Sequence, residues 1–294
     1  MSHDDPRAGL ELARLIGDAT STDGHAPFGE HILLTLDGQR RVNHARIASR
    51  LDERLAGFLV LSEALGGAWY ADLVTAPEFR GRGVTTAMLL AARDHVASHG
   101  GGCLRSWAYS HGPVDSLAAG LGMSVCRAVR YQQLPLAPGR TPVQAPPGVR
   151  LRTLGREEAG AWLALSNAAF AGHPENGGWT NEDLAWRLAS PWTALDRFVV
   201  AADAVTDRLL GGVWTKVMPG SGEAELYVVA VHPDWTGRGV ARVLVQEALR
   251  VLTDCGLQVA SLYVDSDNAA ALALYAAAGF VTHHEDRCFE VAVP

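Results

Sequence analysis

The fold of this chain is decided by the stretch Leu226-Tyr-Val-Val-Ala-Val-His-Pro-Asp-Trp-Thr-Gly-Arg-Gly-Val240. Its first six residues are apolar and mostly β-branched or aromatic, which predicts a buried strand. A tight Gly-Arg-Gly turn follows, and the apolar positions after the turn recur at helical spacing. Such a turn directs backbone N–H groups and a helix N-terminus at one point, so the stretch predicts an anion site suited to a pyrophosphate.

A second copy of this pattern lies earlier in the chain, at Leu73-Val-Thr-Ala-Pro-Glu-Phe-Arg-Gly-Arg-Gly-Val84, offset by 156 residues (239 − 83). Leu121-Gly-Met123 and Ala278-Gly-Phe280 also match, at an offset of 157 (279 − 122). Between the copies, Pro135–Gly148 contains five prolines and is typical of an extended linker. We therefore predict two duplicated α/β domains, 1–134 and 150–294, joined by a linker at 135–149.

The second half shows the expected order of elements most clearly. We predict a strand over 226–231, a helix from Val240 to Leu252 that ends before Gly256, and a strand over 259–264. A further helix is expected from Asn268 to Ala278, because asparagine is a good N-cap, alanine favours helix and Gly279 can end it. Each domain is thus expected to hold a mixed central sheet flanked by helices.

Bulk composition excludes several classes of protein. The chain has 294 residues, of which 48% are hydrophobic and 19% charged, a composition typical of globular domains. The net charge of -7 argues against a broad nucleic-acid or anionic-membrane surface. No signal peptide and no apolar run of about 18 residues is visible, so we expect a cytoplasmic protein. We also expect a monomer whose partner is a small molecule. The four cysteines form no CxxC pair, which indicates reduced, mostly buried thiols, and we find no metal site.

Both turns resemble the CoA-binding motif of the GNAT acetyltransferase superfamily, Arg/Gln-x-x-Gly-x-Gly/Ala. The first copy, Arg80-Gly-Arg-Gly-Val-Thr85, keeps the arginine but ends in threonine. The second copy, Thr236-Gly-Arg-Gly-Val-Ala241, has threonine in the first position. Asn268-x6-Tyr275-x3-Gly279-Phe280 resembles the last helical segment of that superfamily. The resemblance implies tandem GNAT-type domains that use acetyl-CoA as cosubstrate.

Further segments, in combination, resemble the mycothiol synthase family of tandem GNAT enzymes, over nearly the whole chain. They are Asp23–Glu30, His173–Thr180, Trp214–Val217, Glu225–Val229 and Leu262–Asn268. That family transfers acetyl from acetyl-CoA to the cysteinyl amine of Cys-GlcN-Ins and so makes mycothiol. Two alternatives stay open: a tandem GNAT enzyme acting on another small amine, such as an amino sugar or a peptide N-terminus, and a non-catalytic acyl-CoA sensor.

The resemblance implies specific contacts. Acceptor contacts are implied at Glu30, Glu175, Lys216, Glu225 and Tyr263. Contacts with CoA in the second half are implied at Val229, Ala230, Val231, Thr236, Gly237, Arg238, Gly239, Val240, Ala241, Arg242, Asn268, Ala269, Ala270, Ala271, Leu272 and Ala273. In the first half they are implied at Leu73, Val74, Thr75, Gly81, Arg82, Gly83, Val84, Thr85 and Thr86.

The repeat also indicates which half is catalytic. Acetyl transfer to an amine needs a base for the ammonium, an N–H that polarises the thioester carbonyl and an acid for the departing thiolate. We expect Glu225 to be the base, directly or through a water, Tyr275 the acid, and an amide in 229–231 the N–H donor. At the offsets of 156 and 157 their counterparts are Trp69 and Ala118. The first half is therefore expected to keep a CoA turn without catalysis.

Overall fold

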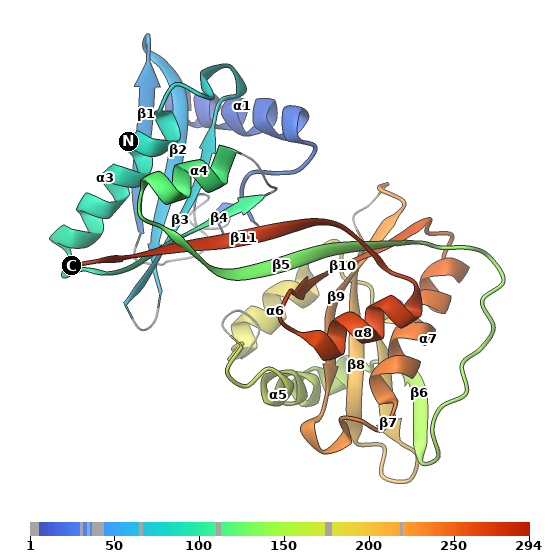
Figure 1. Cartoon of the computed structure of the whole chain (residues 1–294). Coiled ribbons are helices and arrows are strands. Elements are labelled where there is room, and N and C mark those ends of the chain that lie inside the picture. The colour runs from blue at the N-terminus through green and yellow to red at the C-terminus, as the bar shows by residue number, and fades with distance from the viewer. Residues whose placement is uncertain are drawn as a thin grey trace. The chain divides into compact units, whose positions relative to one another are not determined.

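A computed structural model describes residues 6–29, 32–33, 36, 44–64, 67–109, 113–173, 178–217 and 220–294 of the chain (Figure 1). The chain divides into two compact units. Unit 1 comprises residues 1–128 and 286–294, and unit 2 comprises residues 129–285. Each unit contains one copy of the Gly-Arg-Gly turn, so the predicted duplication is visible as two α/β units.

Unit 1 has a mixed sheet in the strand order β1-β2-β3-β4-β11, in which only β3 and β4 run parallel. Helix α1 and helix α3 pack on this sheet, and Trp69 lies against α3. Its elements are α1 (Pro6–Asp23), β1 (His44–Leu51), β2 (Arg54–Glu63), β3 (Ala68–Thr75), η1 (Pro77–Phe79), α3 (Val84–Ser98), β4 (Gly102–Tyr109), α4 (Pro113–Gly120) and the end of β11 (Val281–Val293).

Unit 2 has a mixed sheet in the order β5-β10-β9-β8-β7-β6, in which only β9 and β10 run parallel. Helices α7 and α8 pack on one face, and α5 and α6 pack on the other (Figure 1). The elements are β5 (Ser124–Pro135), β6 (Val149–Thr153), η2 (Arg156–Glu158), α5 (Ala159–Ala169), α6 (Asn181–Ala189), η3 (Leu195–Arg197), β7 (Val199–Asp203), β8 (Leu209–Val217), β9 (Glu223–Val231), η4 (Pro233–Trp235), α7 (Val240–Asp254), β10 (Val259–Asp265) and α8 (Ala269–Ala278).

The last strand of each half belongs largely to the other unit. Residues 129–135 of β5, which follows α4, pair with β10 in unit 2. Residues 286–293 of β11, which follows α8, pair with β4 in unit 1. The chain therefore passes between the units inside these two strands, whereas the proline-rich segment lies within unit 2, where Leu136 donates its N–H to the carbonyl of Gln258. The domain bounds 1–134 and 150–294 stay a prediction.

Local sequence signals are confirmed in unit 2. Helix α7 begins at Val240, and the side chain of Asn268 caps α8 by accepting from the amide of Ala271 at 3.0 Å. Gly279 ends α8 in the left-handed conformation, with φ of 98°. The prediction of mostly buried thiols is wrong: all four cysteines are free, but Cys126 lies in the exposed first residues of β5 and Cys255 lies just after the end of α7.

The described residues contain neither a membrane-spanning helix nor a cluster of metal-ligating side chains. No helix there combines the length and the hydropathy that crossing a bilayer requires. No group of three or more His, Cys, Asp or Glu side chains in those residues is arranged to hold a metal ion.

Candidate active site

The turn before α7 forms an open set of backbone donors. Gly237 and Gly239 have φ of 77° and 80°, a region that favours glycine, and a Cβ at either position would meet no atom within 4 Å. Within the described residues, no amide from Gly237 to Arg242 donates to a protein acceptor; the first that does is Val243, to Gly239 at 3.2 Å. These amides and the α7 dipole can hold a pyrophosphate, as the sequence predicts.

The turn before α3 repeats this geometry. Gly81 and Gly83 have φ of 72° and 77°, and the first amide with a helical acceptor is that of Ala87, which donates to Gly83 at 2.9 Å. The arginine of each turn lies over an aromatic ring: Arg82 over Phe79 at 5.5 Å, and Arg238 over Trp235 at 4.9 Å. Both turns therefore have the backbone geometry that a CoA pyrophosphate requires.

Side chains around the two turns differ. In unit 1, Arg80 forms a two-bond ion pair with Asp23, at 2.8 and 2.7 Å, and Thr75 shares a 2.9 Å hydrogen bond with Thr85. The counterparts in unit 2, at an offset of 156, are Thr236, Val231 and Ala241, which carry no charge. The unit 1 turn is thus fastened by side chains, whereas the unit 2 turn is left to backbone groups.

The start of α8 is not an open donor set. The amide of Ala269 donates to Asp267, that of Ala271 to the Asn268 side chain, and that of Leu272 to Asn268. These implied CoA-binding residues therefore have most of their amides satisfied within the chain, in contrast to the turn before α7.

Strands β9 and β10 separate within the sheet. Their parallel ladder contains three register pairs and stops at Ser261 and Glu225, although β9 continues to Val231 and β10 to Asp265. Beyond this point the β9 backbone that faces β10 is left without ladder bonds, so those amides of 229–231 that point towards β10 rather than β8 are available to a ligand between the strands. Glu225 lies where the separation begins.

A β-bulge next to this point sets the direction of the Glu225 side chain. Thr215 pairs with Leu226 and Trp214 pairs with Val228, so Tyr227 is the extra residue of β9. Before the bulge, Ala224 and Leu226 pack towards α7; after it, Val228 packs towards α5 and α6. Since neighbouring side chains in a strand alternate, Glu225 faces the α5/α6 side.

Lys216 lies on the same face as Glu225. The two residues are register partners on β8 and β9, and the Nζ of Lys216 lies 5.0 Å from the centre of the Trp192 ring and 5.6 Å from that of Tyr227. The aromatic cluster includes Trp179, stacked on Tyr227 at 6.2 Å. The structure thus brings together two predicted acceptor contacts over a rigid aromatic floor.

Tyr263 completes the described part of the predicted acceptor set. It lies on β10, two residues beyond Ser261, and is 51% exposed. Next to it, Asp265 forms a 3.1 Å bond with the Nε2 of His173. Glu30 and Glu175 lie outside the described residues, so their predicted contacts stay predictions.

Tyr275 is on the opposite side of the unit 2 sheet. It is buried in the cluster formed by α7, α8 and the strands, and its ring lies 5.9 Å from that of Phe280. Burial raises the pKa of its hydroxyl to about 12. The hydroxyl makes no hydrogen bond to the described residues and stays protonated at neutral pH, as a proton donor must.

Sequence reasoning did not identify Tyr227 and Arg187 as parts of this site. The Nε of Arg187 donates to the Tyr227 hydroxyl at 3.0 Å, and its guanidinium lies 4.0 Å from the centre of the Trp179 ring. The bulge has no signature in a sequence of alternating apolar residues, so only the strand register reveals it. These residues hold the bulged segment against α6.

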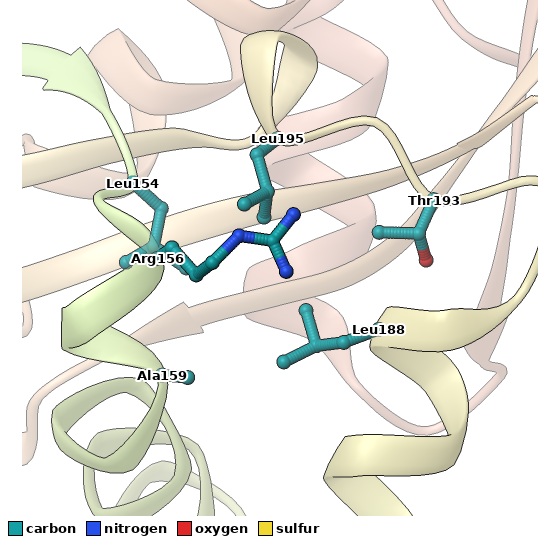
Figure 2. Close-up of a pocket in the computed structure, with 6 residues that line it drawn as sticks. All are labelled: Leu154, Arg156, Ala159, Leu188, Thr193 and Leu195. Carbon is teal, nitrogen blue, oxygen red and sulfur yellow. The ribbon is translucent and has the colours of Figure 1, made fainter.

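A cavity of about 130 Å³ lies elsewhere in unit 2 (Figure 2). The Arg156 guanidinium points between the side chains of Leu188, Thr193 and Leu195 in Figure 2. None of the predicted catalytic, CoA-binding or acceptor residues lines it; its lining is Leu154, Arg156, Ala159, Leu188, Thr193 and Leu195.

Comparison with known proteins adds family and fold. The model of the acetyltransferase (GNAT) family matches residues 15–118 and 161–280. The chain is 39% identical to the mycothiol acetyltransferases of Mycobacterium ulcerans, over 97% of this chain and 93% of that protein, and of Thermomonospora curvata, over 99% and 95%. The corresponding enzyme of Thermobispora bispora is 40% identical over 94% and 92%.

Two solved structures share the fold of the whole chain. A GCN5-related N-acetyltransferase from Sphaerobacter thermophilus has a TM-score of 0.75 at 19% identity, covering 96% of this chain and 92% of its own. A tandem GNAT protein from the clavulanic acid biosynthesis pathway has a TM-score of 0.73 at 18% identity, covering 100% and 97%. The α/β fold with two GNAT domains, predicted from the sequence, is thereby confirmed.

Proposed function

This chain belongs to the acetyltransferase (GNAT) family and, within it, to the mycothiol acetyltransferases, and we propose that its unit 2 acetylates the cysteinyl amine of Cys-GlcN-Ins with acetyl-CoA, forming mycothiol. The observation that carries the choice of unit is the position of Glu225. Glu225 lies where β9 and β10 separate, with its partly exposed side chain on the α5/α6 face, in the strand that leads to the turn before α7.

Acetyl-CoA supplies the thioester whose acetyl group is transferred. The backbone donors from Gly237 to Arg242 are suited to its pyrophosphate, because they lack acceptors among the described residues, and Gly237 and Gly239 border open space there. The amides of 229–231 lie along the separated edge of β9, where one of them can donate to the thioester oxygen as negative charge develops. Unit 1 has the same turn, and we propose that it also binds CoA.

Glu225 acts as the general base. An α-amino group has a pKa near 8, so a carboxylate within reach, directly or through one water, can accept the proton at modest cost. The freed amine then attacks the thioester carbonyl carbon, and its nitrogen releases a second proton to water as the amide forms. Lys216, the register partner of Glu225, carries a positive charge on the same face and can donate to acceptor oxygens.

Tyr275 acts as the general acid towards the departing thiolate, which takes the hydroxyl proton as its bond to the acetyl carbon breaks. The raised pKa of Tyr275 keeps this proton on the hydroxyl before the reaction, so that the hydroxyl can donate to the sulfur as the C–S bond breaks. Because Tyr275 and Glu225 lie on opposite faces of the sheet, base and acid approach the gap between β9 and β10 from opposite sides.

The test is direct product analysis with the full chain. Cys-GlcN-Ins, cysteine, glucosamine and a peptide with a free N-terminus are each incubated with acetyl-CoA, and products are identified by mass spectrometry. Thiol colorimetry alone is unsuitable because the acceptor carries its own thiol. We expect Cys-GlcN-Ins to gain one acetyl group on nitrogen, with its thiol still reactive towards iodoacetamide; a product that had lost thiol reactivity, or a strong preference for another amine, would refute the assignment.

A further inference from the structure

A group of aromatic and polar side chains lies beside Glu225 on the same face of unit 2. We call it the tyrosine patch and define it as Tyr131, Tyr263, His284 and Glu223. Tyr131 and Tyr263 are register partners on β5 and β10, with ring centroids 5.0 Å apart. His284 stacks on Tyr131 at 4.8 Å, with ring planes 25° apart. The patch is therefore a continuous aromatic surface, of which Tyr263 is half exposed.

Hydrogen bonds hold the patch in one arrangement. The hydroxyl of Tyr131 donates to Oε1 of Glu223 at 2.7 Å and accepts from Nε2 of Gln133 at 2.8 Å. Both partners lie beside the base: Glu223 is two residues before Glu225 on β9, and Gln133 pairs with Ser261, which itself pairs with Glu225. Tyr131 thus connects the patch to the strands that carry the base.

We propose that the tyrosine patch is the subsite for the polyhydroxylated sugar–cyclitol part of the acceptor, and that Tyr131 determines acceptor specificity. The proposal rests on the proposed function. Rigid aromatic faces give contact area to the C–H faces of a saturated ring, while a carboxylate oxygen and an amide accept from or donate to its hydroxyls. A purely apolar ligand would give no further donor to Glu223 beyond the Tyr131 hydroxyl, and an anionic one would be repelled by the carboxylates of Glu223 and Glu225.

The spacing agrees with this use. Tyr263 lies two residues beyond Ser261, roughly 7 Å along β10, and one strand spacing of roughly 4.8 Å separates β10 from β9. The amide substituent of a cysteinyl group whose amine lies at Glu225 can therefore reach the patch. The reacting amine and the ring system occupy neighbouring positions on one face.

The patch also gives the first half of the chain a part in the reaction. Tyr131 lies in β5, the last strand of the first half in sequence, which pairs with β10 inside unit 2. Strand exchange therefore places a side chain from the first half in the acceptor site of the second. An isolated second half beginning after the proline-rich segment would lack both the strand and this tyrosine.

The experiment compares two acceptors that share the reacting amine. Tyr131→Leu removes ring and hydroxyl, and Tyr131→Phe removes only the hydroxyl; both are assayed in the full chain with Cys-GlcN-Ins and with L-cysteinamide, which has no ring. We expect Tyr131→Leu to raise KM for Cys-GlcN-Ins about tenfold, with kcat nearly unchanged and kcat/KM for L-cysteinamide unaltered. Tyr131→Phe should give a smaller rise.

A binding measurement makes the test independent of turnover. GlcN-Ins, the acceptor without its cysteine, is used as a competitive inhibitor, and its Ki should rise about tenfold in Tyr131→Leu. Tyr109→Leu is the control, because Tyr109 is a tyrosine in unit 1 that also makes a ring contact, to His25 at 5.2 Å. It should leave both acceptors and the Ki unchanged.

The possible outcomes distinguish a failure of the proposed function from a failure of the proposed subsite. If wild type does not acetylate Cys-GlcN-Ins, the proposed function fails. If wild type is active but Tyr131→Leu lowers kcat/KM equally for both acceptors, or changes neither KM nor Ki, the subsite is wrong. Melting temperatures check folding, and Glu223→Gln, which keeps the shape of the side chain, repeats the test should Tyr131→Leu fail to fold.

Discussion

Units 1 and 2 have the same strand, glycine turn and helix, yet they present different chemistry beside the turn. In unit 1, β2 and β3 pair without a register shift, and Trp69 lies against α3, with its ring 5.7 Å from that of His95. In unit 2, β9 carries a bulge at Tyr227, and Glu225 faces away from α7. One extra residue in β9 therefore decides the direction of the side chain at this position. Trp69 points towards the helix that follows the turn, whereas Glu225 points towards the opposite face of its sheet.

Residues that the repeat aligns in sequence are not always equivalent in the structure. The constant offset of 156 pairs Glu225 with Trp69, but the bulge lies between these residues and the turn. The two side chains consequently face opposite sides of their sheets, so they are equivalent in sequence and not in position. A carboxylate placed at residue 69 would lie beneath α3 rather than beside an acceptor.

The largest effect should come from the base. Glu225→Gln keeps the shape of the side chain but cannot accept the proton, so we expect kcat/KM to fall by about 10²–10⁴-fold. Trp69→Phe keeps most of the buried volume in unit 1 and should change turnover less than twofold. Steady-state kinetics of both variants show which unit is catalytic. A greater loss of kcat/KM in Trp69→Phe than in Glu225→Gln would place catalysis in unit 1.

Tyr275→Phe should have the next largest effect, about a 10²-fold loss in kcat with little change in the KM for acetyl-CoA. Its pKa of about 12 means that the hydroxyl keeps its proton throughout the usual assay range. In the pH profile of wild-type kcat we therefore expect no decrease below about pH 10 that depends on Tyr275. A decrease that is present in wild type and absent in Tyr275→Phe is the result to look for. Such a decrease would contradict the acid role.

The turns can be compared by matched glycine substitutions. Gly239→Ala and Gly83→Ala each put a Cβ into a left-handed backbone position and into the open space of a turn, which strains the backbone by roughly 1 kcal/mol. We expect Gly239→Ala to raise KM for acetyl-CoA about tenfold, whereas Gly83→Ala leaves turnover unchanged. Native mass spectrometry should show one CoA fewer per chain in Gly83→Ala; equal kinetic losses would make the units catalytically alike.

The bulge itself can be tested by a smaller change. Tyr227→Phe removes the hydroxyl that accepts from Arg187, so the segment carrying Glu225 is held less firmly. We expect kcat to fall about fivefold while KM for both substrates stays within twofold, because a single hydrogen bond contributes about 1 kcal/mol. Arg250→Gln, which removes an arginine paired with Glu247 on the α7 face, is the control and should have no effect.

The smallest effect on turnover should come from Asp72 in unit 1, where the consequence is for stability. Oδ2 of Asp72 is buried and has no hydrogen-bond partner in the described part of the chain, and burial raises the pKa of this carboxyl to about 6. A carboxyl group whose pKa is higher in the folded protein than in the unfolded chain contributes stability that is fully present below its unfolded pKa. This contribution is lost as the pH rises through about 6.

The wild-type free energy of unfolding should therefore fall by up to about 3 kcal/mol between pH 4 and pH 7 on account of this group. Asp72→Asn should lack that slope and should be the more stable protein at pH 8. Urea unfolding at the two pH values measures the difference, and an Asp72→Asn variant less stable than wild type at pH 8 would show that the charge is compensated.

Much of the fold could be predicted because its signals are local. The bounds of α7 and α8, the capping by Asn268 and the glycine turns depend on residues within one or two helical turns of each other. Which unit each of the strands β5 and β11 belongs to could not be predicted in the same way. Nothing in the sequence of β5 distinguishes pairing with β4 from pairing with β10, since both partners present the same alternation of side chains.

Residue identity and short spacing in the sequence are enough to predict two glycine turns and to show that Glu225 and Tyr275 have no counterpart in the first half. Strand pairing is needed to show that Glu225 and Lys216 share a face, that Tyr275 lies on the opposite side of the sheet, and that Tyr131 from the first half belongs to unit 2. Those relations depend on strand register and on one bulge. They arise when long-range pairing satisfies the backbone hydrogen bonds of the two sheets, and no short segment contains that information.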